Sequence, residues 1–157
     1  MKVTQLIFTA VLFGVPILLV WGYSKINKDV PFRWANGFKA VICLFFVGFG
    51  IYGHILNPGM STQLIPEIFR FPLVWSFLTG VIELVLAVLL WTRFQRQIGL
   101  VTVVYLIIIL PFNYYGWTQI DLSPNYIDDP NYMWFRTAMQ AVLIAFAYYG
   151  TREPNSA

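Results

Sequence analysis

Apolar residues run in long stretches along this chain, and short polar segments separate them. A helix needs about 20 apolar residues to cross a bilayer core that is about 30 Å thick. Five stretches reach or approach that length and carry few charges. We therefore predict an all-α fold, a polytopic transmembrane helix bundle with five spans, over residues 3–23, 36–54, 71–91, 98–113 and 132–150.

The stretch over residues 71–91 is the clearest of the five. It reads FPLVWSFLTGVIELVLAVLLW, with one charge, Glu83. At about 1.5 Å per residue Glu83 lies about 18 Å beyond Phe71, near the middle of a bilayer. A carboxylate there costs about 3 kcal/mol, so Glu83 is either protonated or held by a partner. Small or polar residues on the same helix face predict close packing against the bundle: Ser76, Thr79, Gly80 and Ala87.

The other stretches carry signals for their ends and kinks. Residues 3–23 have the length of a span or of a signal peptide; no small-x-small cleavage site follows, which favours a retained helix kinked at Pro16. The basic turn at residues 92–97 predicts that the helices on either side of it are antiparallel neighbours. Pro111 predicts a bend or an end near Asn113.

Two segments between the predicted spans are polar or rich in turn residues. Residues 55–70 hold Pro58, Gly59 and Pro66, and predict a loop or a short interfacial helix over residues 60–68, capped by Ser61 or Thr62. Residues 114–131 predict an acidic loop.

Composition supports a membrane protein with one transmembrane domain over residues 1–157. The chain is 59% hydrophobic and 11% charged, against about 25% charged in soluble domains. The net charge of +3 is too small and scattered to indicate nucleic acid binding. The single Cys43 excludes an internal disulfide, and one histidine cannot supply two axial haem ligands, so we expect no metal site.

Basic residues predict the orientation of the bundle. Seven of the ten lie on one side, which the positive-inside rule places in the cytoplasm together with the C-terminus, leaving the N-terminus outside: Lys25, Lys28, Arg33, Lys39, Arg93, Arg96 and Arg152. Aromatic residues near the helix ends are expected to anchor the bundle at the interfaces: Trp21, Tyr23, Trp34, Trp75, Trp91, Trp117, Tyr132 and Trp134.

With this topology, five polar residues gather in the outer half of the membrane as a candidate ligand-binding pocket: His54, Glu83, Asn113, Arg136 and Gln140. Ionisable groups buried in a bilayer are functional candidates. Each also has a structural interpretation, since a carboxyl can fix packing, an arginine can reach the interface and an amide can bond carbonyls freed by a proline. We expect Arg136 to pair with Glu83, although the predicted depth of Glu83 in the membrane is closer to that of Gln140 than to that of Arg136.

Several short motifs occur in a fixed order over residues 37–152: Gly50-Ile51-Tyr52-Gly53-His54, Asn57-Pro58, Ile65-Pro66, Phe71-Pro72, Gly80-Val81-Ile82-Glu83, Pro111-Phe112-Asn113, and Arg136 with Gln140. In this order they resemble the DoxX and DoxX-like family of small membrane proteins. The resemblance implies a four-helix core, to which residues 3–23 add an N-terminal helix, in a bacterial or archaeal plasma membrane. It also implies that the five polar residues carry the family's function.

The resemblance leaves the function open between two main alternatives. The family includes a subunit of a thiosulfate:quinone oxidoreductase. The first alternative is therefore the membrane subunit of a redox system, with a quinone as candidate cofactor, although no motif of this chain requires a quinone. The other is a non-catalytic structural or assembly subunit of a larger complex. The expected partners are the lipid bilayer and other membrane-protein subunits or a second copy. No inverted repeat supports a transporter.

Overall fold

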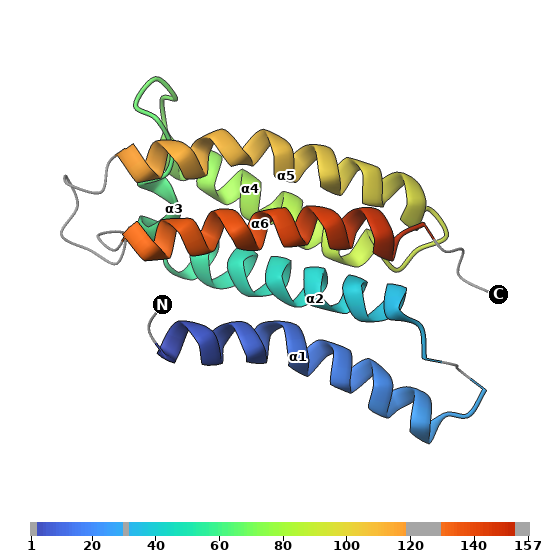
Figure 1. Ribbon diagram of the computed structural model, residues 1–157. Helices are drawn as coiled ribbons and strands as arrows, with labels where there is room; N and C mark the ends of the chain where they lie inside the picture. The colour runs from blue at the N-terminus through green and yellow to red at the C-terminus, as the bar shows by residue number, and fades with distance from the viewer. Residues whose placement is uncertain (1–2, 30–31, 119–129, 153–157) are drawn as a thin grey trace.

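The protein is described here by a computed structural model of residues 3–29, 32–118 and 130–152, and this part of the chain is helical without a β-strand (Figure 1). The predicted all-α class is confirmed. The long helices lie side by side along one direction. In chain order the elements are α1 (Val3–Ile26), α2 (Trp34–Gly48), the π-helix η1 (Phe49–Leu56), the short α3 (Gly59–Thr62), α4 (Pro72–Leu89), α5 (Gln95–Thr118) and α6 (Pro130–Gly150).

Helix α2 is the central element of the bundle. It packs against α1, α4 and α6, while η1 packs against α4 and α5 packs chiefly against α6. Helix α1 lies at the edge of the bundle beside α2 (Figure 1). The apolar core is formed where α2 meets its neighbours, and its buried residues are Val41, Ile42, Phe46, Leu86, Ala87, Leu90, Leu106, Leu143 and Ala147.

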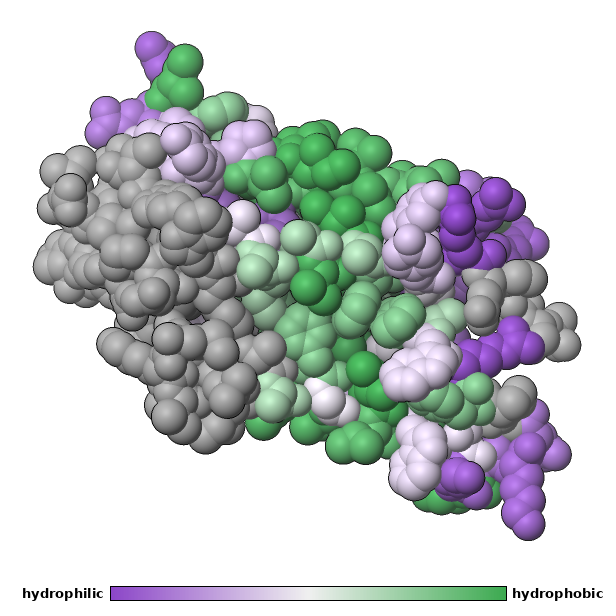
Figure 2. All heavy atoms as spheres, viewed as in Figure 1, coloured by the Kyte–Doolittle hydropathy of each residue, from purple (hydrophilic) through white to green (hydrophobic). Residues whose placement is uncertain are grey.

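The surface of the bundle is apolar over its middle. Leu18, Leu73 and Val88 are each more than 60% exposed. Figure 2 shows an apolar band over the middle, with hydrophilic residues at the right-hand end and at the upper left. Within the described residues three helices are long and apolar enough to cross a membrane, and α1 contributes a shorter apolar segment, Ala10–Ile26; the three are Trp34–Leu56, Pro72–Leu89 and Gln95–Gly116. This arrangement indicates a membrane protein.

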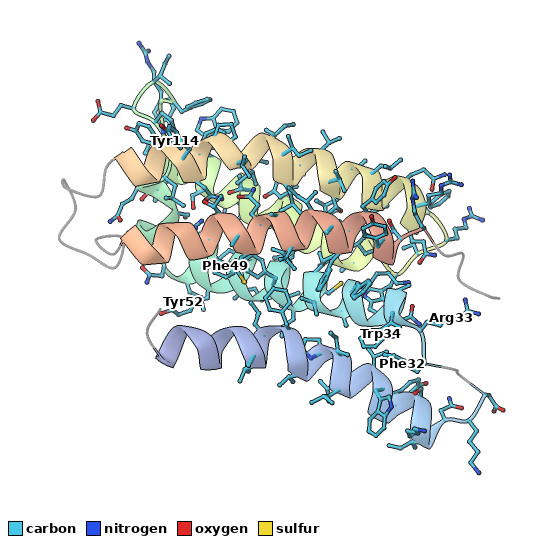
Figure 3. The ribbon with its side chains drawn as sticks, viewed as in Figure 1. Phe32, Arg33, Trp34, Phe49, Tyr52 and Tyr114 are labelled. Carbon is cyan, nitrogen blue, oxygen red and sulfur yellow. The ribbon has the colours of Figure 1, made fainter. Side chains whose placement is uncertain are left out.

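Exposed aromatic side chains mark both ends of the bundle. Trp34 lies at one end with Phe32 and Arg33, and Tyr52 and Tyr114 lie at the other (Figure 3). Trp34 is 61% exposed and Tyr114 67% exposed, as membrane-interface residues would be. The side chains of Trp117, Tyr132 and Trp134 lie outside the described residues.

Helix α5 continues through Pro111, so the predicted end near Asn113 is wrong. The helix runs to Thr118, five residues into the predicted loop, and residues 119–129 of that loop lie outside the described part of the chain. Proline removes one backbone donor from a helix interior. The carbonyl that loses its donor is that of Ile107, four residues before Pro111. Gln140 of α6 donates from Nε2 to the preceding carbonyl, that of Leu106, at 2.5 Å, and so links this turn of α5 to α6.

The segment between η1 and α4 combines the two predicted alternatives, a loop and a short helix. The second helix continues as η1 to Leu56, and the predicted interfacial helix over residues 60–68 is wrong in length, because α3 ends at Thr62 and the rest of the segment forms a loop. Tight turns follow it, with Leu64 N–H bonded to Ser61 O. Ser61 does not cap the start of α3; its hydroxyl donates to the carbonyl of Gly53, at 3.0 Å, in the last turn of η1.

Lys39 lies inside the bundle rather than at the membrane surface that its use as an orientation signal implies. It is 1% exposed. Its Nζ donates to Oε1 of Gln95, at 2.7 Å, and lies 4.9 Å from the centre of the Trp91 ring. The Nε1 of Trp91 also donates to Cys43 Sγ, at 3.0 Å. The buried ammonium is therefore held by an amide oxygen and an aromatic face.

Candidate functional site

The structure places the five predicted site residues in the half of the bundle that contains η1 and sorts them into two groups. His54 and Glu83 form one, between η1 and α4. Asn113, Arg136 and Gln140 form the other, between α5 and α6. Glu83, Asn113 and Gln140 are buried, at 5–7% exposure, so the two groups are inside the bundle and not on its lipid-facing surface.

The carboxyl group of Glu83 has one oxygen bonded and one unbonded. Oε1 accepts a hydrogen bond from the hydroxyl of Tyr105, at 3.3 Å. Oε2 is buried and has no hydrogen-bond partner among the described residues, and Nε2 of His54 lies 3.7 Å from it. Leaving a buried polar atom unpaired costs about 1–3 kcal/mol. Such an atom is a candidate acceptor for a ligand or a moving proton.

Close contact between η1 and α4 brings His54 to Glu83. Gly80 of α4 has no side chain, and a Cβ built there would lie 2.6 Å from His54 Cβ and 3.0 Å from Gly50 O. The π-helix also changes the register of the chain, so that Asn57 N–H bonds to Tyr52 O, five residues back, at 2.8 Å. Long π-helices are rare and are often found at functional sites.

Hydroxyl groups surround the other ring nitrogen of His54. Ser76 Oγ and Thr79 Oγ1, both on α4, each lie 3.2 Å from Nδ1. Ser76 is fully buried, and its hydroxyl is also hydrogen-bonded to that of Ser61 in α3. The imidazole therefore lies between a carboxyl group on one side and hydroxyl groups on the other.

The second group joins α5 to α6. Arg136 Nη2 donates to Asn113 Oδ1, at 2.9 Å, and Asn113 Nδ2 donates to Gln140 Oε1. The predicted direct pair of Arg136 with Glu83 is wrong, because the carboxyl oxygens bond to Tyr105 or to nothing. The charge of Arg136 still acts on both Glu83 and His54, so the two groups are electrostatic neighbours.

Residues 42–151 match the family described as Domain of unknown function (DUF8561), and this stretch is 110 of the 157 residues. The chain belongs to the DUF8561 family. The matching region contains η1, α4, α5, α6 and all five candidate residues, whereas α1 lies outside it. No curated protein and no solved structure matches the chain.

Three site residues in the DUF8561 region are not predicted as such by the sequence pattern. Tyr105 bonds to Glu83, and its only sequence signal is a hydroxyl in the middle of an apolar run. Ser76 is recognisable only as a small residue on the Glu83 face, and Ser61 only as a helix cap. The hydroxyls of Ser61 and Ser76 meet because the short α3 packs against both η1 and α4.

The arrangement provides proton donors and acceptors at membrane depth. Glu83, His54 and the hydroxyls can exchange protons, while the amides of Asn113 and Gln140 hold helices together. Within the described ranges, no cluster of three or more His, Cys, Asp or Glu side chains is placed to hold a metal ion.

Proposed function

We propose that this DUF8561 protein is the membrane subunit of a quinone-linked redox system, and that the headgroup of a quinone binds beside Glu83 and His54. The observation that carries the proposal is the buried, unbonded Oε2 of Glu83, 3.7 Å from His54 Nε2. The resemblance of its motifs to the DoxX family supports the same reading. We further propose that α1, α2 with η1, α4, α5 and α6 all cross a bacterial or archaeal plasma membrane, with the N-terminus outside.

The chemistry of the site matches that of a quinone headgroup. A quinol hydroxyl would donate to Glu83 Oε2, and a quinone carbonyl would accept from His54 when Nε2 carries the proton. The Tyr105 ring, edge-on to Phe46 with centroids 6.0 Å apart, provides an aromatic wall.

In the proposed system, the electrons that reduce the quinone come from a partner subunit. Conversion of a quinone into a quinol takes up two electrons and two protons. Glu83, His54 and Tyr105 supply proton exchange and hydrogen bonds, and a redox centre on a partner subunit supplies the electrons. We therefore place this chain as the quinone-binding part of a complex.

Quinone binding by the purified protein tests the proposal. A short-chain quinone is titrated into the protein in mild detergent while tryptophan fluorescence is followed. We expect Glu83→Gln to weaken binding about tenfold, the value of one lost hydrogen bond of about 1.4 kcal/mol. Glu67→Gln is the matched control, because Glu67 is exposed and lies outside the cluster. A wild-type protein that neither carries nor binds a quinone overturns the proposal.

A second candidate function is a non-catalytic subunit that packs within a larger membrane complex. It is favoured by the second polar group, in which Arg136, Asn113 and Gln140 bond to one another and to a backbone carbonyl. Such bonds are sufficient as packing contacts between α5 and α6. A quinone-free protein whose Glu83→Gln and Arg136→Gln variants keep both the complex and the cellular phenotype would support this alternative.

A further inference from the structure

A line of hydrogen-bonding side chains leads from the buried carboxyl of Glu83 toward one end of the bundle. Glu83 Oε2 lies 3.7 Å from His54 Nε2, and His54 Nδ1 lies 3.2 Å from Ser76 Oγ. The hydroxyl of Ser76 is bonded to that of Ser61. The four side chains come from α3, η1 and α4, so the line exists only in the folded bundle.

The line ends close to water. Ser61 is 7% exposed and directly precedes Thr62. Thr62 lines an open pocket of about 470 Å³ at this end of the bundle. Its other lining residues are Gln63, Ile65, Pro66, Glu67, Phe69, Arg70, Phe71, Pro72 and Tyr115. The lining is more apolar than polar, and an exposed carboxylate and an exposed guanidinium are its charged groups.

Burial of the hydroxyls argues against a role in apolar packing. Ser76 has no exposed surface, and a buried hydroxyl must be bonded to avoid a desolvation penalty. Its partners are another hydroxyl and an imidazole, which can both accept and donate protons. Thr79 offers a contrast: its hydroxyl is as close to His54 but otherwise reaches only the carbonyls of Trp75 and Ser76.

We infer that Ser61, Ser76 and His54 form a proton relay between the pocket at the end of the bundle and the carboxyl group of Glu83. The inference rests on the proposed function in one respect, since quinone reduction at a buried site requires a supply of protons. The 3.7 Å gap between His54 and Glu83 is longer than a hydrogen bond, and contacts of this kind often shorten when a ligand binds.

Each transfer moves one proton and makes no bond between heavy atoms. The Ser61 hydroxyl turns from the carbonyl of Gly53 toward Ser76, receives a proton from water and releases its own to Ser76 Oγ. Ser76 in turn releases its own proton to Nδ1 of His54. The imidazole, now protonated on both nitrogens, releases the Nε2 proton to Oε2 of Glu83. The carboxylate becomes a carboxylic acid, and the ring keeps its proton on Nδ1. The net change is one proton moved from water to Glu83, without an oxidant or a reductant.

The test measures how fast the ring protons of His54 exchange with water. His54 is the single histidine of the sequence, so protein made with ¹⁵N-labelled histidine gives one pair of ring-nitrogen signals in nuclear magnetic resonance. The protein is studied in lipid nanodiscs without quinone. We expect Ser61→Ala and Ser76→Ala each to slow the exchange about 100-fold, the usual contribution of a positioned proton-transfer group.

Two variants serve as controls. Thr79→Val removes a hydroxyl that lies at the same distance from His54 but off the relay. Ser24→Ala removes an exposed hydroxyl of α1 that bonds to the carbonyl of Trp21, outside the relay and the pocket. Both should exchange at the wild-type rate. Since the two test variants interrupt the line at different places, one that fails to fold leaves the other as the test.

Unchanged exchange in a folded Ser61→Ala or Ser76→Ala protein overturns the relay, and so does equal slowing in Thr79→Val. Slowed exchange in a protein that binds no quinone supports the relay and overturns the proposed function. Quinone binding with unchanged exchange supports the proposed function and overturns the relay.

Discussion

Arg136 and Glu83 carry opposite formal charges in the same half of the bundle and use different hydrogen-bond partners. Arg136 donates to Asn113, and Glu83 accepts from Tyr105. A guanidinium that bonds an amide oxygen keeps its charge and still acts on the carboxyl through space. The residues therefore form two short-range groups that are linked by a longer-range interaction.

This arrangement predicts which pairs of substitutions are coupled. In thermal unfolding in mild detergent, the effects of Arg136→Gln and Asn113→Ala should be non-additive by about 0.5–3 kcal/mol, because the two residues share a hydrogen bond. The coupling between Arg136→Gln and Glu83→Gln should be smaller than that of the first pair, because these residues share no hydrogen bond and interact only through space. Coupling between the second pair and none between the first would contradict the grouping.

The sequence could predict the half of the bundle that holds the site but not the pairing within it. Counting residues along a helix gives depth, and depth placed His54, Glu83, Asn113, Arg136 and Gln140 together. Pairing depends on where each side chain points and on the lateral offset between helices, which no residue count contains. Tyr105 is an example of a contact that the sequence could not predict, because its hydroxyl reaches Glu83 only when α5 packs against α4 as it does in the structure.

At the scale of elements, η1 and α4 approach each other closely at two glycines, Gly50 and Gly80. A Cβ at Gly50 would lie 3.1 Å from Gly80 O, and a Cβ at Gly80 would lie 3.0 Å from Gly50 O. Small residues at such crossings allow backbones to meet without side chains between them. Here the contact also determines the position of His54, since its Cβ lies over Gly80.

A methyl group at Gly80 should therefore separate the two elements. We expect Gly80→Ala to destabilise the protein by about 1–3 kcal/mol through overpacking, and to weaken quinone binding by moving His54. Gly48→Ala is the matched control, because a Cβ there meets nothing within 4 Å. It should be neutral or stabilising by up to about 1 kcal/mol, from helix propensity alone. Unfolding midpoints in mild detergent measure both; equal midpoints for the two variants would contradict the close contact.

Hydrophobic length predicted where helices occur, while their local form depended on contacts between helices. Pro111 does not end α5, which continues to Thr118, and the turn before Pro111 is bonded to Gln140 of α6. The π-helix η1 has no distinct sequence signal, since FGIYGHIL is equally compatible with an α-helix. The predicted helix over residues 60–68 is replaced by α3 and tight turns, in which Ser61 bonds to η1.

At the scale of the whole molecule, the two ends of the bundle differ in charge. Lys25, Lys28, Arg93 and Arg96 lie at the ends of helices or in the turn on the Trp34 side, while the candidate site lies toward Tyr52 and Tyr114 (Figures 1 and 3). The positive-inside rule predicts that the basic end faces the cytoplasm, and under the topology proposed above the Glu83 site would lie in the outer half of the membrane.

Labelling of single cysteines tests this orientation. In a Cys43→Ser background, Glu67→Cys and Arg93→Cys place exposed thiols at opposite ends of the bundle. An impermeant thiol reagent should label Glu67→Cys in intact cells and label Arg93→Cys only after permeabilisation. The reverse pattern would place the site in the cytoplasmic half and would contradict the proposed topology.

The packing of α6 between α2 and α5 has a consequence for the order of biosynthesis. Phe146 of α6 stacks on Phe38 of α2, with centroids 4.4 Å apart, although about 100 residues separate them in the chain. At about 5–20 residues per second, a ribosome needs roughly 5–20 s to synthesise that interval. Until the last helix is inserted, Asn113 lacks both Gln140 and Arg136 and α2 lacks one of its three neighbours. Asn113 precedes Gln140 by 27 residues, so its amide waits roughly 1–5 s for this partner, while α2 waits the longer interval for α6. This is the stage at which an insertion chaperone would be most useful to the nascent chain.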